Sequence, residues 1–178
     1  MNFNQIVTTL TSRFSEAILS TDKFRDEHTF MVKPQFIKDV CLCLKDDLGF
    51  DLCSDICGAD RFTDDDRFEV VYNLFNTGEK IRIRLKVRVD ESDPHVPSVV
   101  SVWESADWYE RETYDMYGIV FEGHPDLRRI YMPEDFEYYP LRKEFPLIGI
   151  PGSIPLPEIE KAAQHKDAGE AYNNQERI

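Results

Sequence analysis

The sequence has no run of about 20 apolar residues, the length that a helix needs to cross a bilayer. It also lacks an N-terminal basic stretch followed by an apolar core, since it begins with MNFN at residues 1–4. We therefore expect no spanning helix and no signal peptide, and a protein that reaches a membrane only through partners.

Positive charge is scarce as well. The 178 residues include 21 Lys and Arg against 34 Asp and Glu, a formal net charge of −13. Two blocks hold most of the excess: residues 51–70 carry two basic and seven acidic side chains, and residues 101–150 carry five and eleven. Because nucleic-acid binding depends on neutralising phosphates, this balance argues against a nucleic-acid partner. The hydrophobic fraction of 42% is that of an ordinary globular domain.

Cysteine is limited to Cys41, Cys43, Cys53 and Cys57, and no glycine-rich nucleotide loop is present. The four cysteines admit a metal or iron–sulfur site. However, structural zinc sites usually place Cys-x2–4-Cys pairs on turns, and the first pair falls within a predicted helix, where residues i and i+2 point in different directions. We therefore favour small buried thiols in a reducing compartment.

Apolar periodicity predicts one α+β domain. The helices are expected at 3–19, 34–48 and 105–117, and the strands at 28–33, 50–57, 68–75, 80–89 and 96–103. Strict alternation over 80–89 (KIRIRLKVRV) gives the sheet one covered and one polar face. This pattern is typical of a two-layer fold, with a mixed, largely antiparallel sheet and helices on one face. We expect this domain over residues 1–117, followed by a long irregular C-terminal extension.

Two charged segments of the sequence each allow two interpretations. Asp64–Asp66 lack the spacing of a calcium loop, so we expect residues 60–67 to form a solvated connection. The polar face of the predicted strand 80–89 carries Arg82, Arg84, Lys86 and Arg88, which form either a solvated face or a docking surface for an acidic partner.

The predicted helix at 105–117 places Trp108, Glu112 and Met116 on one stripe. A carboxylate between large apolar side chains needs a cationic partner or a proton. We predict that Glu112 pairs with Arg128 or Arg129. The alternative is a free-standing enzyme with an acid–base cluster of Glu110, Glu112, Asp115 and His124.

Residues 118–157 hold seven of the ten prolines and many apolar side chains. Such a segment is too apolar for a disordered linker and too long for an ordinary loop. We expect it to lie extended on a partner protein, with Arg128, Arg129, Arg142 and Lys143 making charged contacts. The alternative is an irregular cap on the chain's own sheet. Residues 158–178 are predicted to be a polar tail, with a short helix within 158–172.

Two blocks of sequence carry a specific resemblance. Residues 107–119 (DWYERETYDMYGI) and 121–130 (FEGHPDLRRI), followed by 140–147 (PLRKEFPL), resemble the 30-kDa-type subunit of bacterial NADH:quinone oxidoreductase (respiratory complex I), also called its C subunit. The resemblance extends over roughly residues 50–150. Two positions depart from it: Tyr138 and Tyr139 stand where members often have Gly-His, and Tyr117 replaces a common Phe.

The resemblance implies a non-catalytic accessory subunit of the peripheral arm on the cytoplasmic side of the bacterial inner membrane. It implies no cofactor, metal or catalytic residue in this chain, with FMN, iron–sulfur clusters and quinone bound by partner subunits. The implied partners are chiefly the quinone-site subunit, which is related to the large subunit of nickel–iron hydrogenases, and the subunit that holds the terminal cluster. A homologous subunit of a related membrane-bound hydrogenase or non-NADH quinone dehydrogenase is the alternative.

The resemblance also assigns a set of interface or structural residues. They are Glu110, Arg111, Glu112, Asp115, Gly118, Phe121, Gly123, His124, Pro125, Leu127, Arg128, Arg129, Pro140, Leu141, Arg142, Lys143 and Phe145.

Overall fold

The computed structural model describes residues 3–25, 27–62 and 65–149. The predicted tail at 158–178 and the end of the proline-rich segment, residues 150–157, lie outside the described residues. The chain divides into two compact units, Met1–Phe145 and Pro146–Ile178, and every helix and strand given below belongs to the first. Among the described residues, no helix has the length and apolar character needed to cross a membrane.

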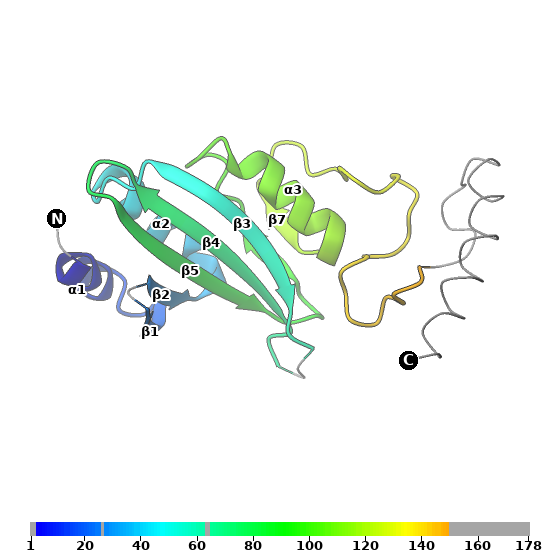
Figure 1. Ribbon diagram of the computed structural model, residues 1–178, viewed down its shortest axis with the longest axis horizontal. Helices are drawn as coiled ribbons and strands as arrows, with labels where there is room; N and C mark the ends of the chain where they lie inside the picture. The colour runs from blue at the N-terminus through cyan, green and yellow to red at the C-terminus, as the bar shows by residue number, and fades with distance from the viewer. Residues whose placement is uncertain (1–2, 26, 63–64, 150–178) are drawn as a thin grey trace, which may run out of the picture. The chain divides into compact units, whose positions relative to one another are not determined.

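A five-stranded sheet in the order β1-β2-β5-β4-β3 forms one layer of the fold (Figure 1). Its strands are β1 (Ile18–Phe24), β2 (Glu27–Val32), β3 (Leu52–Asp60), β4 (Phe68–Asn76) and β5 (Ile81–Val89). Neighbouring strands are antiparallel, except that β2 and β5 are parallel. The predicted hairpin is confirmed as β4 and β5, where the apolar residues from Ile83 to Val89 are buried and the basic residues between them are not.

Three helices cover one face of this sheet. They are α1 (Phe3–Arg13), α2 (Ile37–Asp46) and α3 (Ala106–Tyr117). A short 3-10 turn, Pro34–Phe36, leads into α2, and the fixed φ of Pro34 suits this first turn. Each helix contributes to the same core, for example through Leu10, Leu44 and Ala106. The predicted α+β fold, with a mixed sheet and helices on one face, is therefore confirmed.

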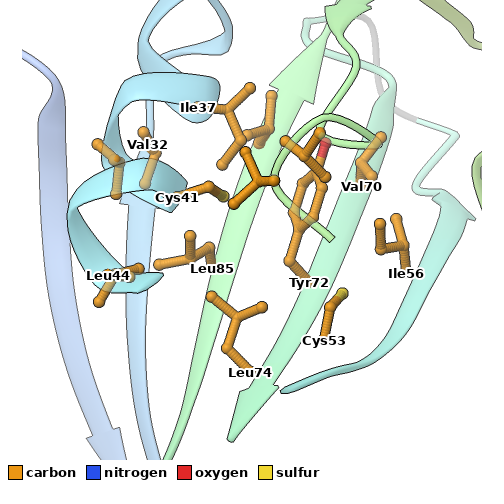
Figure 2. Packing of buried hydrophobic residues seen from close by; sticks show 14 of the residues in the cluster. Val32, Ile37, Cys41, Leu44, Cys53, Ile56, Val70, Tyr72, Leu74 and Leu85 are labelled. Carbon is orange, nitrogen blue, oxygen red and sulfur yellow. The ribbon is translucent and has the colours of Figure 1, made fainter. Parts of the chain in front are cut away.

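The core lies between α2 and the inner face of the sheet. In Figure 2, Cys41 and Leu44 of α2 lie near Leu85 and Tyr72 of the central strands. Cys53 is also in this cluster, so the prediction of small buried thiols holds for these two cysteines and for Cys43, whereas Cys57 is exposed.

The first helix ends earlier than predicted. It stops at Arg13, where a turn closed by hydrogen bonds from Ala17 and Ile18 N–H to the Phe14 carbonyl leads into β1. Ala17 is buried as the helical spacing requires, but it reaches the core from this turn. The sequence prediction of one helix over 3–19 was wrong because β1 is exposed along most of its length and shows no alternation.

The strand predicted at 96–103 is also shorter. Only His95–Pro97 form a strand, β6, after which Val102 and Trp103 donate to the Val99 carbonyl in a turn. Strand β6 pairs in parallel with β7 (Val120–Glu122), which lies in the proline-rich segment and was not predicted. This pairing begins the return of the chain along α3.

Candidate partner interface

The residues that carry the family resemblance lie on α3 and on the chain that follows it. Helix α3 ends at Gly118, whose φ of +77° belongs to the left-handed region that favours glycine. A Cβ atom at this position would lie 2.6 Å from the Tyr139 ring and 2.9 Å from an Arg142 guanidinium nitrogen. Gly118 therefore ends the helix and lets the returning chain pack closely against it.

We expect Gly118→Ala to lower the free energy of unfolding by about 2–4 kcal/mol, from left-handed strain and from contact with Tyr139 and Arg142. Gly123→Ala is the matched control, because Gly123 has a φ of +80° but nothing within 4 Å of a Cβ atom. Urea unfolding of both variants measures the difference. Equal losses would mean that the close packing at Gly118 contributes nothing.

Asp115 holds the returning chain to α3. Its side chain is fully buried, and Oδ2 accepts hydrogen bonds from the backbone N–H groups of Ile130 (3.0 Å), Tyr131 (2.7 Å) and Met132 (3.0 Å). Oδ1 pairs with Arg129 Nη1 at 2.8 Å. Burial opposes ionisation, but these hydrogen bonds outweigh it and lower the pKa of Asp115. Asp115 is therefore a charged structural anchor.

Two arginines complete this anchor. Arg129 also donates to the Phe136 carbonyl at 2.7 Å and lies over the rings of Phe136 and Tyr139. Arg111 donates to the Arg128 carbonyl at 3.2 Å. Both guanidinium groups thus contact their own chain, and the charged contact of Arg129 with a partner stays a prediction.

The second sequence block packs against the end of α3. Leu141 N–H donates to the Met116 carbonyl at 3.1 Å, and Arg142 Nε donates to the Tyr117 carbonyl at 2.7 Å. The Arg142 guanidinium also lies over the rings of Phe68 and Tyr139. The described residues from Gly118 to Phe145 therefore make many of the contacts that the cap alternative predicts.

A buried ion cluster, which the sequence did not predict, fixes this block to the sheet. Arg67 donates to both Asp60 oxygens, at 3.0 and 2.7 Å, and pairs with Glu91 and Glu144. Asp60 also accepts from Lys143 N–H at 2.8 Å. Burial opposes ionisation of Asp60, yet these bonds, first among them those from Arg67, lower its pKa to about 2. The expectation that 60–67 is a solvated connection was wrong at its two ends, since Asp60 and Arg67 are buried.

The predicted partner of Glu112 was wrong. Glu112 is exposed, and within the described ranges Arg128 pairs with Asp126 at 2.9 Å and Arg129 with Asp115. The buried residues of α3 are Ala106, Glu110, Arg111, Thr113 and Asp115. The stripe that contains Trp108 and Glu112 is therefore not the buried face of α3. The polar side chains on the buried face find hydrogen-bond partners within the fold.

Glu110 is the carboxylate that the fold places in the core. It is fully buried, and its Oε1 accepts from Val99 N–H at 2.7 Å while Oε2 has no hydrogen-bond partner. Burial raises the pKa of Glu110 to about 7, against the lowering effect of hydrogen bonds from Ser98 and Val99.

The four groups of the acid–base alternative do not converge. Glu110 and Asp115 are each held by separate backbone donors, and Glu112 is exposed. His124 Nδ1 accepts from Asp126 N–H at 3.0 Å, and its Nε2 lies 3.2 Å from the Asp107 carbonyl. In the part of the chain that the structure describes, no three His, Cys, Asp or Glu side chains are grouped as metal ligands.

The basic face of β5 is partly neutralised within the chain. Arg84 pairs with Glu27 at 2.9 Å, while Lys86 and Arg88 pair with Glu69 at 2.7 and 2.9 Å. Arg82 instead lies over the Phe75 ring. Two carboxylates thus balance two of the four positive charges on this face, so the choice between a solvated face and a docking surface stays open.

Large apolar side chains are exposed along α3 and the chain that returns beside it. The exposed fractions are 61% for Trp108, 61% for Tyr131 and 52% for Leu141, and Tyr138 is exposed as well. Other exposed apolar residues, Leu19 and Phe24, lie on β1. Because Arg111, Asp115 and Arg129 make their contacts within the chain, the α3 side combines exposed apolar side chains with a rigid internal scaffold, as protein interfaces do.

Comparison with known proteins identifies the family of this chain. Residues 30–150 match the family described as respiratory-chain NADH dehydrogenase, 30 Kd subunit. The second C-type subunit of NADH-quinone oxidoreductase from Rhizobium meliloti is 48% identical over 145 residues, which span 80% of this chain and 79% of that protein. The C-type subunit from Geobacter metallireducens is 43% identical over 153 residues, spanning 85% and 94%.

Two solved structures share the fold. A trypsin-resistant fragment (1–134) of Nqo5 is 32% identical, with a TM-score of 0.62 over 71% of this chain and 100% of that chain. A chain of the membrane-bound sulfane sulfur reductase, an archaeal respiratory membrane complex, is 26% identical, with a TM-score of 0.70 over 82% and 86%.

Proposed function

This chain belongs to the family of the 30-kDa subunit of respiratory-chain NADH dehydrogenase, and on that premise we propose that it is a non-catalytic structural and assembly subunit of a proton-pumping NADH:quinone oxidoreductase. It stands in the peripheral arm and docks on the quinone-site subunit, beside the subunit with the terminal cluster. The names of the relatives support membership of this complex, and the docking contact is our inference from the exposed apolar surface.

The observation that carries this proposal is the division of roles around α3. Asp115, Arg111 and Arg129 make their contacts within the chain, while Trp108, Tyr131 and Leu141 face outward. Exposed aromatic and aliphatic groups on a rigid support are typical of interface anchors, whereas catalysis needs convergent polar groups. We infer that the segment 118–157 contacts a partner through these exposed side chains.

The same reasoning assigns the cofactors to other subunits. We propose that FMN, iron–sulfur clusters and quinone bind elsewhere in the complex, and that this chain reaches the cytoplasmic side of the bacterial inner membrane through its partners. The likeness to a sulfane sulfur reductase chain supports a second candidate, a homologous subunit of a related respiratory complex with another electron donor. The electron donor of the purified assembly distinguishes the two candidates.

We expect the double variant Tyr131→Ser/Leu141→Ser to reduce recovery of the quinone-site subunit by at least about tenfold, because two apolar anchors are lost. The measurement is co-purification with the tagged full-length chain, quantified by mass spectrometry. The double variant Leu19→Ser/Phe24→Ser is the matched control, since it removes two apolar side chains of β1 that are at least similarly exposed. Wild-type recovery with Tyr131→Ser/Leu141→Ser would show that this face is not the docking surface.

A further inference from the structure

A groove lies between α3 and the outer strand β3. The two elements approach closely because Gly58 has no side chain: a Cβ atom there would lie 2.5 Å from the Tyr117 ring and 3.0 Å from Thr113. Beside this contact, Cys57, Glu112, Met116 and Leu141 are among the residues that line the groove. The groove thus joins β3, α3 and the returning chain within one compact unit.

The size of the groove argues for a side chain as its occupant. Its volume is about 180 Å³, close to the roughly 150 Å³ cavity that holds a benzene-sized molecule. Cofactor and small-molecule sites are larger, at about 300–1,000 Å³. Met116, Tyr117 and Leu141 supply apolar walls. One aliphatic or aromatic side chain of a neighbouring protein therefore fits this volume.

The charge of the groove defines its partner further. Strand β3 belongs to one acidic block of the sequence and α3 to the other, and their contact brings the two blocks together. Asp55 accepts a hydrogen bond from Asn73, whose own oxygen accepts one from Arg84, so this carboxylate is already hydrogen-bonded within the chain. Glu112 is exposed at the groove and has no ion pair among the described residues. A carboxylate beside an apolar groove is complementary to Lys or Arg.

A polar atom in the lining also lacks a partner. Thr113 is only 2% exposed, lines the groove, and has a hydroxyl oxygen without a hydrogen bond in the described structure. Buried polar atoms are usually hydrogen-bonded, because leaving one unpaired costs free energy. Since solvent does not reach this atom, a segment seated in the groove supplies the missing partner only if the lining side chains shift on binding.

We propose that the groove between α3 and β3 binds a basic segment of a neighbouring subunit, which inserts one apolar side chain and pairs a Lys or Arg with Glu112. This inference rests on the proposed function, since it needs a partner subunit, and it names the chemistry of that partner. The apolar walls and the unpaired Glu112 support it independently, and the unpartnered Thr113 hydroxyl lies beneath them.

Variants of the full-length chain in the assembled complex test the proposal. Glu112→Arg should reduce recovery of the neighbouring subunits by about tenfold, because attraction becomes repulsion. Asp46→Arg, a matching charge reversal at an exposed site on α2, should leave recovery unchanged. Thr113→Val should reduce recovery by a few-fold without lowering the melting temperature of the isolated chain, since it removes an unpaired buried hydroxyl.

A carbodiimide, which couples carboxylates directly to lysines, provides a second measurement on the wild-type complex. We expect a cross-link from Glu112 to a lysine of another subunit, absent in Glu112→Gln. Wild-type recovery with both Glu112→Arg and Thr113→Val, or coupling of Glu112 only within its own chain, would overturn the groove proposal. If the wild-type chain itself recovers no other protein of complex I, the proposed function fails instead.

Discussion

Replacing Asp115 with alanine should lower the free energy of unfolding by about 3–5 kcal/mol, the cost of breaking a buried ion pair from one side. The change leaves the buried Arg129 guanidinium without its carboxylate and removes the acceptor for three consecutive backbone N–H groups, at residues 130–132. Chemical denaturation of the isolated chain measures the loss.

The control for this variant is Asp126→Ala. Asp126 also pairs with an arginine, Arg128, at the same kind of distance (2.9 Å), but both side chains are more than half exposed. Exposed pairs contribute about 0–1 kcal/mol, so the control should stay close to wild type. Similar effects of the two changes would mean that the carboxylate of Asp115 is not an anchor of the fold.

The second large effect is a pH dependence caused by Glu110. Its pKa is about 7 in the folded chain, above its usual 4.5, so the folded state binds the proton more tightly than the unfolded state. Its contribution to stability is therefore fully present below about pH 4.5 and is lost as pH rises to about 7. With about 1.4 kcal/mol per pKa unit, the loss amounts to about 3 kcal/mol.

Glu110→Gln should remove this dependence, because glutamine is neutral throughout and keeps an oxygen for Val99 N–H. The measurement is the free energy of unfolding at pH 5 and pH 8, compared between wild type and variant. Glu110 also interacts electrostatically with Asp107, Tyr72, Cys41 and Cys53. These four residues are present in both proteins, so they do not distinguish wild type from the variant. Glu112→Gln, on the exposed side of α3, should behave as wild type. A Glu110→Gln curve parallel to wild type would contradict the assignment.

The sheet could be predicted from the sequence because its signal is local. Alternation along β5 reports directly that one side faces the core, and the turn between β4 and β5 lies within a few residues. Strand β1 could not be predicted in this way, because both of its sides are largely exposed and its residues carry no alternation. The α+β class follows from the strongest elements alone.

The orientation of α3 could not be predicted, for a different physical reason. Asp115 and Glu110 are buried because backbone N–H groups at residues 130–132 and at Val99 reach them. These donors belong to irregular chain, whose path no periodicity describes. The sequence prediction placed Glu112 among large apolar side chains such as Trp108, whereas the structure exposes both of these residues. It buries Glu110 and Asp115 instead. The family resemblance named these residues without saying which way they point.

The parallel pairing of β2 with β5 has a consequence for synthesis of the chain. Residues His28–Met31 lie beside Ile83–Lys86, with α2, β3 and β4 between them in the sequence. During translation, the β1–β2 hairpin leaves the ribosome long before the strand that completes its sheet, and an isolated two-stranded hairpin is only marginally stable in water. The β1–β2 hairpin is therefore not stabilised until the β4–β5 hairpin has been synthesised. A ribosome that pauses before residue 86 leaves β2 with an unpaired edge.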